Sequence, residues 1–375
     1  MKKVANIIAL SITFLLIAGL LISYLSVFIS PERFWVFAFF GLIYPYLLIG
    51  NIMALLFLAI KKNKVSILVL FVILLGWNHL NNYIRIIRKS PNVVNLSSMT
   101  ESNINQATAK ILSYNVQMFN LYDKDNKEKS VDKFFNFMNG ENFDIICLQE
   151  VLTADIFKLS LPEIKQNLSN TKNSYIQFTG GKQSNHRYGI AIFTKFPIIN
   201  KGEILFKNTS NLSIFIDLLI GGDTIRVYNN HLQSFRLGNE NFRFLTELEK
   251  SMEDPPIQEV RDIASRMKNA YIKRAGQAEL LSKHIHTSPY PVIVCGDFND
   301  TPVSYAYHTI RKDLKDSFVE TGLGLGKTYS RIIPSYRIDY IFHSPDLASS
   351  EFKTIRKDYS DHYPVRTLIS PADSK

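Results

Sequence analysis

Three long runs without charged residues occupy the first quarter of the chain. They cover residues 4–29, 34–60 and 65–82 and consist largely of Ile, Leu, Val, Ala and Phe. About 20 apolar residues suffice for a helix to cross the hydrocarbon core of a bilayer. We therefore expect a transmembrane region of about three helices within residues 1–90. In the third run, Asn78, His79 and Asn81 dilute the apolar character after Trp77, so a bundle of two spans stays open as an alternative.

A cleavable signal peptide is the other explanation of the first run, because Lys2 and Lys3 supply a positive start. Signal peptides have an apolar core of roughly 7 to 15 residues. The first run is longer than that, and two further apolar runs follow it directly. We therefore expect an integral, multi-pass membrane protein whose partner is the lipid bilayer; no protein partner is inferable from the sequence.

The distribution of charge indicates the orientation of the helices in the membrane. Residues 1–100 contain nine basic residues and one acidic residue, of 43 and 33 in the whole chain. Basic residues accumulate in cytoplasmic loops. Lys2, Lys3 and the turn at residues 61–64 therefore predict that the rest of the chain lies on the extracytoplasmic, periplasmic side of the inner (cell) membrane. Arg85 and Arg88 oppose this orientation, and two spans instead of three would reverse it.

The remainder of the chain is predicted to be a polar linker followed by one α+β domain. Residues 91–108 are rich in Ser and Asn and lack an apolar period, which is typical of a linker. Short apolar runs then predict strands and helices over residues 109–375. Helices are expected at 131–139 and 259–286, and strands at 111–116, 143–148, 174–179, 189–194, 213–219, 224–230, 291–295, 337–342, 352–355 and 365–369. Cys147 and Cys295 lie within apolar runs, and we expect both to be buried free thiols.

Polar residues recur where the predicted strands end. They are Asn115, Glu150, His231, Asp297, Asn299, Asp339, Asp361 and His362. Each has a structural explanation when it is taken alone, such as a turn, a helix cap or an ion pair between Asp339 and Arg337. Their recurrence at strand ends is how a rigid sheet presents a polar site.

The motifs that contain these residues resemble those of the endonuclease/exonuclease/phosphatase superfamily, the deoxyribonuclease I-like metal-dependent phosphoesterases. LQE, NxH, GDFN, DYI and SDH occur in this order between residues 110 and 369. The chain looks like a membrane-anchored, bacterial-type member. The resemblance implies a four-layered α/β/β/α sandwich, with two packed mixed β-sheets flanked by helices, and it implies Mg²⁺ or Mn²⁺ as cofactor.

The resemblance also implies a role for each residue of the site. Glu150, Asn115, Asp361 and Asp297 would bind the metal, and Asp297 would alternatively position the water. His362 would be the general base, and Asp339 would orient it. His231 and Asn299 would contact the substrate phosphate, and Arg187 or Tyr188 would add a further contact, although an ordinary solvent-facing loop explains these two residues equally well.

The function implied is hydrolysis of a phosphodiester, in a nucleic acid or in a lipid head group. A phospholipid or sphingomyelin phosphodiesterase and a phosphoinositide-type phosphatase are the alternatives. The abasic-site endonuclease branch usually carries an acidic residue and Asn where this chain has NNH, which disfavours that role. A catalytically silent, membrane-tethered binding module is disfavoured because the motif residues are intact. Residues 234–256 fit either a lid over the site or a surface helix.

Overall fold

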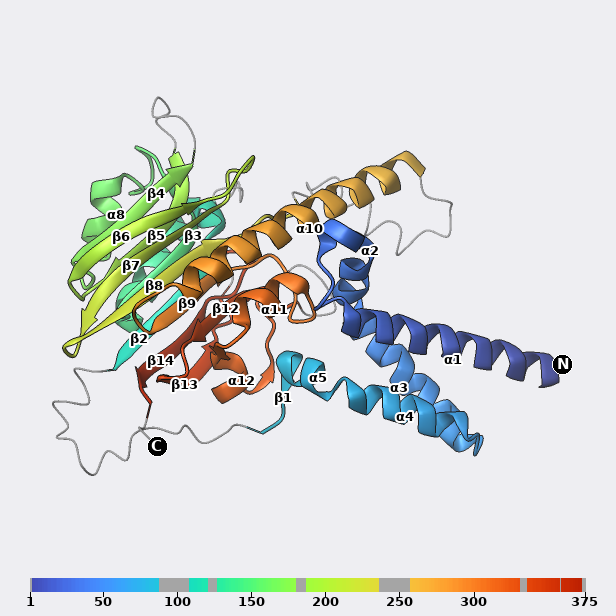
Figure 1. Cartoon of the computed structure of the whole chain (residues 1–375). Helices are drawn as coiled ribbons and strands as arrows, with labels where there is room; N and C mark the ends of the chain where they lie inside the picture. The colour runs from blue at the N-terminus through green and yellow to red at the C-terminus, as the bar shows by residue number, and fades with distance from the viewer. Residues whose placement is uncertain are drawn as a thin grey trace. The chain divides into compact units, whose positions relative to one another are not determined.

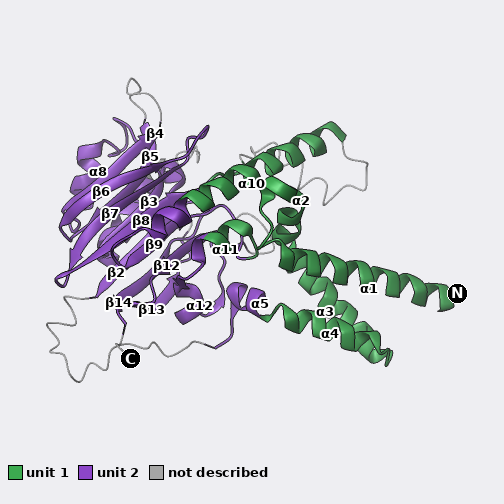
Figure 2. Cartoon of the chain, in the orientation of Figure 1, with its two compact units in different colours: residues 1–77, 233–280, 303–309 green, residues 78–232, 281–302, 310–375 purple. Residues whose placement is uncertain are grey.

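The computed structural model describes residues 2–87, 108–120, 127–179, 187–235, 257–330, 336–357 and 359–372. The predicted linker 91–108 and the segment 234–256 fall almost entirely outside the described residues. The chain divides into two compact units, shown in Figure 2. The first contains Met1–Trp77, Gln233–Leu280 and Val303–Thr309, and the second contains Asn78–Leu232, Leu281–Pro302 and Ile310–Lys375.

The first unit contains the apolar helices. They are α1 (Lys2–Leu25), α2 (Pro31–Leu42), α3 (Tyr44–Ile60) and α4 (Val65–Leu75), and α5 (Trp77–Tyr83) follows in the chain. Among the described residues, the stretch Lys3–Leu25 within α1 is the one helix that is long and apolar enough to cross a membrane unaided. The pairs α2 with α3 and α4 with α5 also qualify if each bent pair counts as one span.

The expected second and third spans are each interrupted by a bend. The axes of α2 and α3 differ by 54°, and those of α4 and α5 differ by 58°. Pro45 occupies the first turn of α3, where its ring is tolerated but cannot continue a preceding helix. At Gly76, a Cβ atom would lie 2.1 Å from the hydroxyl of Tyr24, which donates to the carbonyl of Val72. Close packing of α1 therefore coincides with the second bend, which hydrophobicity alone does not predict.

Part of α10 (Ile257–His286) belongs to the same unit and packs on α2. Ala38 of α2 lies in one apolar cluster with Ile263, Met267 and Tyr271 of α10. The expected helix 259–286 is confirmed, and its spacing of apolar residues reflects this contact.

The second unit contains two six-stranded mixed sheets (Figure 1). One sheet has the order β13-β14-β2-β3-β5-β4 and the other β10-β12-β9-β8-β7-β6. Within them, β2 pairs with β3 and β8 with β9 in parallel, and the other neighbouring strands are antiparallel. The strands of the first sheet are β2 (Ala109–Asn115), β3 (Ile145–Thr153), β4 (Asn173–Thr179), β5 (Arg187–Thr194), β13 (Leu347–Thr354) and β14 (Val365–Pro371). Those of the second are β6 (Ile198–Leu205), β7 (Leu212–Ile220), β8 (Asp223–His231), β9 (Val292–Asp297), β10 (Lys315–Asp316) and β12 (Asp339–His343).

Helices and short elements complete the second unit. They are η2 (Gln117–Asn120), α7 (Lys127–Glu141), α8 (Leu161–Asn167), α11 (Tyr305–Arg311), which begins in the first unit, α12 (Ser317–Thr321), and the paired strands β1 (Ile84–Arg85) and β11 (Gly324–Leu325). Side chains of α7 and α8 pack on β2, β3 and β5. On the other sheet, the hydroxyl of Tyr228 in β8 lies 2.9 Å from Nδ1 of His284 in α10. Two mixed sheets with helices, as expected, are confirmed.

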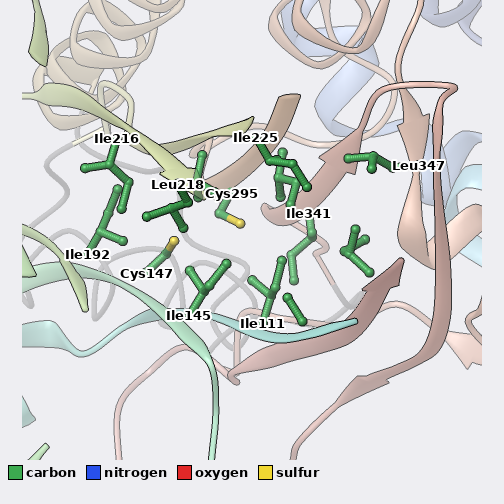
Figure 3. Packing of buried hydrophobic residues seen from close by; sticks show 14 of the residues in the cluster. Ile111, Ile145, Cys147, Ile192, Ile216, Leu218, Ile225, Cys295, Ile341 and Leu347 are labelled. Atoms are coloured by element: carbon green, nitrogen blue, oxygen red, sulfur yellow. The ribbon is translucent and has the colours of Figure 1, made fainter. Parts of the chain in front are cut away.

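The core between the sheets is apolar and contains both cysteines (Figure 3). Cys147 comes from β3 and Cys295 from β9, and both are buried free thiols, as expected. Burial raises the pKa of the Cys147 thiol, and its hydrogen bond with Cys295 raises it further. The Cys147 thiol therefore stays protonated at neutral pH.

Candidate active site

Strand register in the second sheet brings three predicted site residues together. β9 ends at Asp297, which is the register partner of His231 in β8 and of Asp339 in β12. Gly296 permits this close pairing, because its φ is +145° and a Cβ atom there would lie 2.1 Å from the carbonyl oxygen of Asn230. The three polar side chains therefore share one end of the sheet.

The first sheet contributes Asn115 and Glu150 to the same place. Asn115 ends β2, and Glu150 lies in an irregularity of β3 between Leu148 and Val151, with a φ of +53°. Such positive φ values in residues other than glycine are strained and cluster at functional sites. The Nδ2 atom of Asn115 donates to Glu150 Oε1 at 3.2 Å and to Asp297 Oδ2 at 3.0 Å. Asn115 therefore links the two sheets at the site.

Asp361 joins the site through Gln117. The Nε2 atom of Gln117 donates to Asp361 Oδ2 at 2.9 Å, and the backbone N–H of Asp361 donates to Gln117 Oε1. The backbone N–H of Gln117 donates to Asn115 Oδ1 at 3.0 Å. Asn115 therefore turns its amide nitrogen, not its oxygen, toward Glu150. Gln117 was not predicted from the sequence, although it lies only two residues after Asn115.

His362 and Asp339 form a buried pair. Nδ1 of His362 lies 3.0 Å from Asp339 Oδ2, and Nε2 lies 3.7 Å from Asp297 Oδ2. The ring of Tyr329 packs edge-on against the imidazole, a contact that sequence reasoning missed. Burial on its own lowers the pKa of His362, but the charges of Asp339 and Asp297 outweigh it and raise the pKa to about 10. The two carboxylates therefore favour the protonated form of the imidazole.

Asp297 is a buried carboxylate of the site, as Asp339 is. Burial raises its pKa, while the charges of His362 and His231 oppose that change. Asp297, Asp339 and His362 each offer a ligand atom, and these atoms lie within 4.8 Å of one another, a grouping that fits a metal ion.

His231 and Asn299 lie on the other side of Asp297. Nε2 of His231 is 3.5 Å from Glu150 Oε1 and 3.9 Å from Asp297 Oδ2, and it is buried without a hydrogen bond to any described residue. A buried polar atom without a partner is a candidate ligand contact. Asn299, with a φ of +53°, donates through Nδ2 to Leu232 O at 3.0 Å and to Asp297 Oδ2 at 3.2 Å.

Arg187 and Tyr188 are not joined to this group by any hydrogen bond or ion pair between described residues. The guanidinium of Arg187 stacks on the ring of Phe178 at 4.4 Å, and Tyr188 is exposed. Both lie at the start of β5, directly after residues that are not described. Their predicted contact with phosphate stays a prediction.

A buried pair of side-chain amides lies next to the site. It was not predicted from the sequence. Gln149 Nε2 donates to Asn229 Oδ1 at 2.6 Å, and Asn229 Nδ2 donates to the carbonyls of Leu148 and Ala191. This pair pins the two sheets together next to Glu150 and His231. Gln149 and Asn229 lie inside the LQE and NNH motifs, next to predicted site residues. This position is the sequence signal that could have identified them.

The donor set fits a hard divalent cation. Glu150, Asp361 and Asp297 offer carboxylate oxygens, which Mg²⁺ and Mn²⁺ prefer. The grouping of metal-binding size among the described residues is Asp297 with Asp339 and His362, and it shares only Asp297 with this donor set. Glu150 is accessible, since its side chain is 30% exposed. Both thiols belong to the apolar core, so soft sulfur ligands are not part of the site.

Comparisons with known proteins bear on the family and the fold. The family model of the Endonuclease/Exonuclease/phosphatase family matches residues 112–362, which is more than half of the chain. A second model, a domain of unknown function (DUF8431), matches residues 5–83. A search of curated proteins found no match.

Two solved structures share the fold. The human Nocturnin catalytic domain, determined with a bound sulfate anion, is 18% identical with a TM-score of 0.51, covering 71% of this chain and 94% of Nocturnin's. An endonuclease/exonuclease/phosphatase from Beutenbergia cavernae is 12% identical with a TM-score of 0.51, covering 71% of this chain and 72% of its own.

Proposed function

The chain belongs to the endonuclease/exonuclease/phosphatase family of metal-dependent phosphoric ester hydrolases, and we propose that it is a membrane-anchored phosphodiesterase that requires Mg²⁺ or Mn²⁺. The observation that carries the proposal is the His362–Asp339 pair, whose free ring nitrogen lies 3.7 Å from a buried carboxylate oxygen. A histidine held in this way is suited to general base catalysis.

His362 takes the proton of the attacking water through Nε2. Its Nδ1–H donates to Asp339, which fixes the tautomer and stabilises the imidazolium that forms. The water then attacks phosphorus in line with the leaving ester oxygen. Nε2 must be unprotonated to accept this proton. The pKa of His362, about 10, must therefore be lower when the cation and the substrate are bound.

Glu150 and Asp361 hold the cation, with Asp297 as a further ligand. When bound, the cation stabilises charge on the phosphoryl oxygens and, through its own charge, lowers the pKa of His362. Asn115 orients Glu150 and Asp297 through its amide nitrogen. Direct ligation by Asn115, as expected from the sequence, requires its amide to turn over and release Gln117.

His231 and Asn299 contact the phosphate opposite His362. The unpartnered Nε2 of His231 supports this assignment, because a phosphoryl or leaving oxygen would satisfy it. Asn299 would exchange one of its present acceptors for a phosphoryl oxygen. Both groups would then stabilise negative charge that develops during the reaction.

The domain order that we propose is a transmembrane region over 1–90, a linker over 91–108 and a catalytic domain over 109–375, facing the periplasm. The apolar stretch Lys3–Leu25 and the two bent pairs support the membrane assignment. A reporter that is fluorescent only in the cytoplasm, fused after Lys375, tests the orientation. Fluorescence from this fusion would refute the periplasmic location.

The test of the activity uses the full chain in detergent with Mg²⁺. Bis(p-nitrophenyl) phosphate reports diester hydrolysis, p-nitrophenyl phosphate reports monoester hydrolysis, and DNA, RNA, sphingomyelin, phospholipids and phosphoinositides report the substrate. We expect diester hydrolysis that EDTA and His362→Ala both abolish. Activity that survives both changes, or the absence of activity on every ester, would refute the proposal.

A lipid head group is the second candidate substrate. The apolar helices favour it, because they would hold the catalytic unit at a bilayer surface. Hydrolysis of nucleic acid but of no lipid in the same panel would exclude it.

A further inference from the structure

A cavity outside the site has an unusual combination of positive charge and apolar surface. Its volume is about 440 Å³, and none of the eight site residues lines it. Four cations line it, namely Lys327, Lys353, Arg356 and Arg366, against one acid, Glu141. We call it the basic cavity. Its volume lies within the range of ligand-binding pockets.

The single acid of the basic cavity is already engaged. Glu141 accepts from Lys110 at 2.9 Å, and Lys110 does not line the cavity. Of the four cations, Arg366 alone forms an ion pair within 4 Å among the described residues, with Glu351 at 3.7 Å. After the contact with Lys110, the charges of Arg366 and Lys353 also lower the pKa of Glu141. The lining therefore has an excess of positive charge that an anion would neutralise.

Strand pairing adds a local repulsion. Lys353 of β13 and Arg366 of β14 are register partners, so two like charges lie opposite each other. Such pairs destabilise a sheet. The register shift between Ser350 and Lys353, where Glu351 has a φ of +52°, sets this arrangement. Irregularities of this kind change the direction in which side chains point, and they are common next to functional sites.

The other walls of the cavity are apolar. Phe318, Phe352, Leu323 and Leu325 line it, and Leu323 and Leu325 are 58% and 53% exposed. Phe318 and Phe352 are buried, but an anion without an apolar part would leave Leu323 and Leu325 in water. The lining therefore fits an amphiphile that joins a negative group to hydrocarbon.

One edge of the cavity is linked, through strand pairing, to the end of the apolar region of the chain. Leu325 lies in β11, which pairs with β1, and β1 directly follows α5. The next residues, Ile86 and Ile87, are 79% and 76% exposed. Exposed apolar residues beside cations are typical of a surface that meets anionic lipid.

We propose that the basic cavity binds the head group of an anionic phospholipid, with Leu323 and Leu325 against the start of its acyl chains. The cations neutralise the phosphate, and the exposed leucines cover the glycerol and first methylenes. This inference relies on the membrane anchoring proposed above and does not require that the bound lipid be the substrate.

The test is lipid binding by the full chain in detergent, measured by native mass spectrometry. Phosphatidylglycerol and phosphatidylcholine are compared, and inorganic phosphate is titrated calorimetrically. The His362→Ala background prevents hydrolysis of the lipid. We expect phosphatidylglycerol to bind at least about tenfold more tightly than phosphatidylcholine, since each basic residue near an anionic head group contributes on the order of 1 kcal/mol.

A triple variant and a matched control locate the site. Lys327→Gln, Lys353→Gln and Arg356→Gln together should weaken phosphatidylglycerol binding at least about tenfold, from the same estimate per charge. Lys207→Gln, Lys283→Gln and Lys312→Gln, which remove three cations outside the cavity, should leave it within about twofold. Leu325→Gln should weaken the lipid and spare inorganic phosphate.

Three outcomes would overturn the inference: equal binding of both lipids, unchanged binding in the triple variant, or inorganic phosphate binding as tightly as the lipid. The last outcome would identify a general anion site. Hydrolysis of bis(p-nitrophenyl) phosphate, measured with His362 intact in the chain without other changes and in the triple variant, separates this inference from the proposed activity. Retained lipid binding without hydrolysis would refute only the activity, and hydrolysis without lipid binding only the cavity.

Discussion

The same strands build the apolar core and the polar site. In β9, Ile293 and Cys295 lie between the two sheets, and Asp297 ends the strand in the site. β3 repeats the pattern with Cys147 in the core and Glu150 in the site. The core residues are packed by both sheets, whereas the site residues bond mainly to one another. Substitutions in the core should therefore lower stability, and substitutions in the site should lower activity, although the residues lie only a few positions apart in the same strands.

The largest expected effect is on catalysis. His362→Ala should lower kcat/KM for a diester by about 10³-fold, within the range that a general base contributes. With Mg²⁺ bound, which lowers the pKa of His362 and so reduces the stability that its charge adds to the metal-free protein, the thermal unfolding midpoint should change little, because the core between the sheets is untouched. His286→Ala, on the exposed end of α10, is the matched control and should retain activity. A large fall in the unfolding midpoint of His362→Ala would contradict the separation.

The reverse separation should hold for the core. Ile293→Ala removes buried side-chain volume from β9, and such changes cost about 2–5 kcal/mol of unfolding free energy. Activity per folded molecule should persist well below the unfolding temperature, since Asp297 keeps its register with His231 and Asp339. Denaturant unfolding and kcat for bis(p-nitrophenyl) phosphate per folded molecule measure the two effects. A proportionate loss of kcat would show that core packing positions the site.

Hydrophobic patterning predicted most of the strands because they are buried on a regular face. The expected strands 213–219 and 224–230 correspond closely to β7 and β8. β6 was missed because most of its residues are exposed, which leaves no apolar period to detect. The bends at Ile43 and Gly76 were missed as well, and Gly76 shows why, since its close contact with Tyr24 depends on packing between helices.

The structure brings eight of the predicted site residues together, whereas Arg187 and Tyr188 are not joined to them and the connections among the eight were not predicted. Acids and histidines at strand ends attract attention because few structural roles need them there. Gln117 and Tyr329 belong to ordinary residue types, and their partners Asp361 and His362 are brought to them by the fold. The orientation of Asn115 likewise depends on the backbone N–H of Gln117, which no motif contains.

A smaller loss of activity is expected from a change to Asp339, the residue that orients His362. Asp339→Asn keeps the size of the side chain but removes the charge that helps raise the pKa of His362. We expect activity to fall by about 10²-fold, at the lower end of general base contributions. The pH at which activity rises should also move down, because the imidazole loses its proton more easily. An unchanged pH profile would indicate that Asp339 only holds the structure.

The smallest expected effect is the pH dependence of stability, which should have opposite signs for histidines inside and outside the site. Burial lowers the pKa of His343, and burial together with Arg226 lowers that of His284. Both therefore stabilise the fold above their unfolded pKa of about 6.5, and this stabilisation is lost as pH falls below it. The raised pKa of His362 in metal-free protein acts oppositely, so its contribution is present below about 6.5 and lost as pH rises toward about 10.

Thermal unfolding of the full chain in EDTA, followed from pH 5.5 to 9, measures both contributions by difference. His284→Gln with His343→Gln should make the unfolding midpoint less sensitive to acid, by about 2 to 4 °C if the pair contributes about 1 kcal/mol. His362→Ala should instead make the midpoint less sensitive to base, because the group that loses its proton there is gone. If both variants reduce the change of the unfolding midpoint over the same pH range, the histidines inside and outside the site have pKa shifts of the same sign. That result would contradict the expected difference between the two regions.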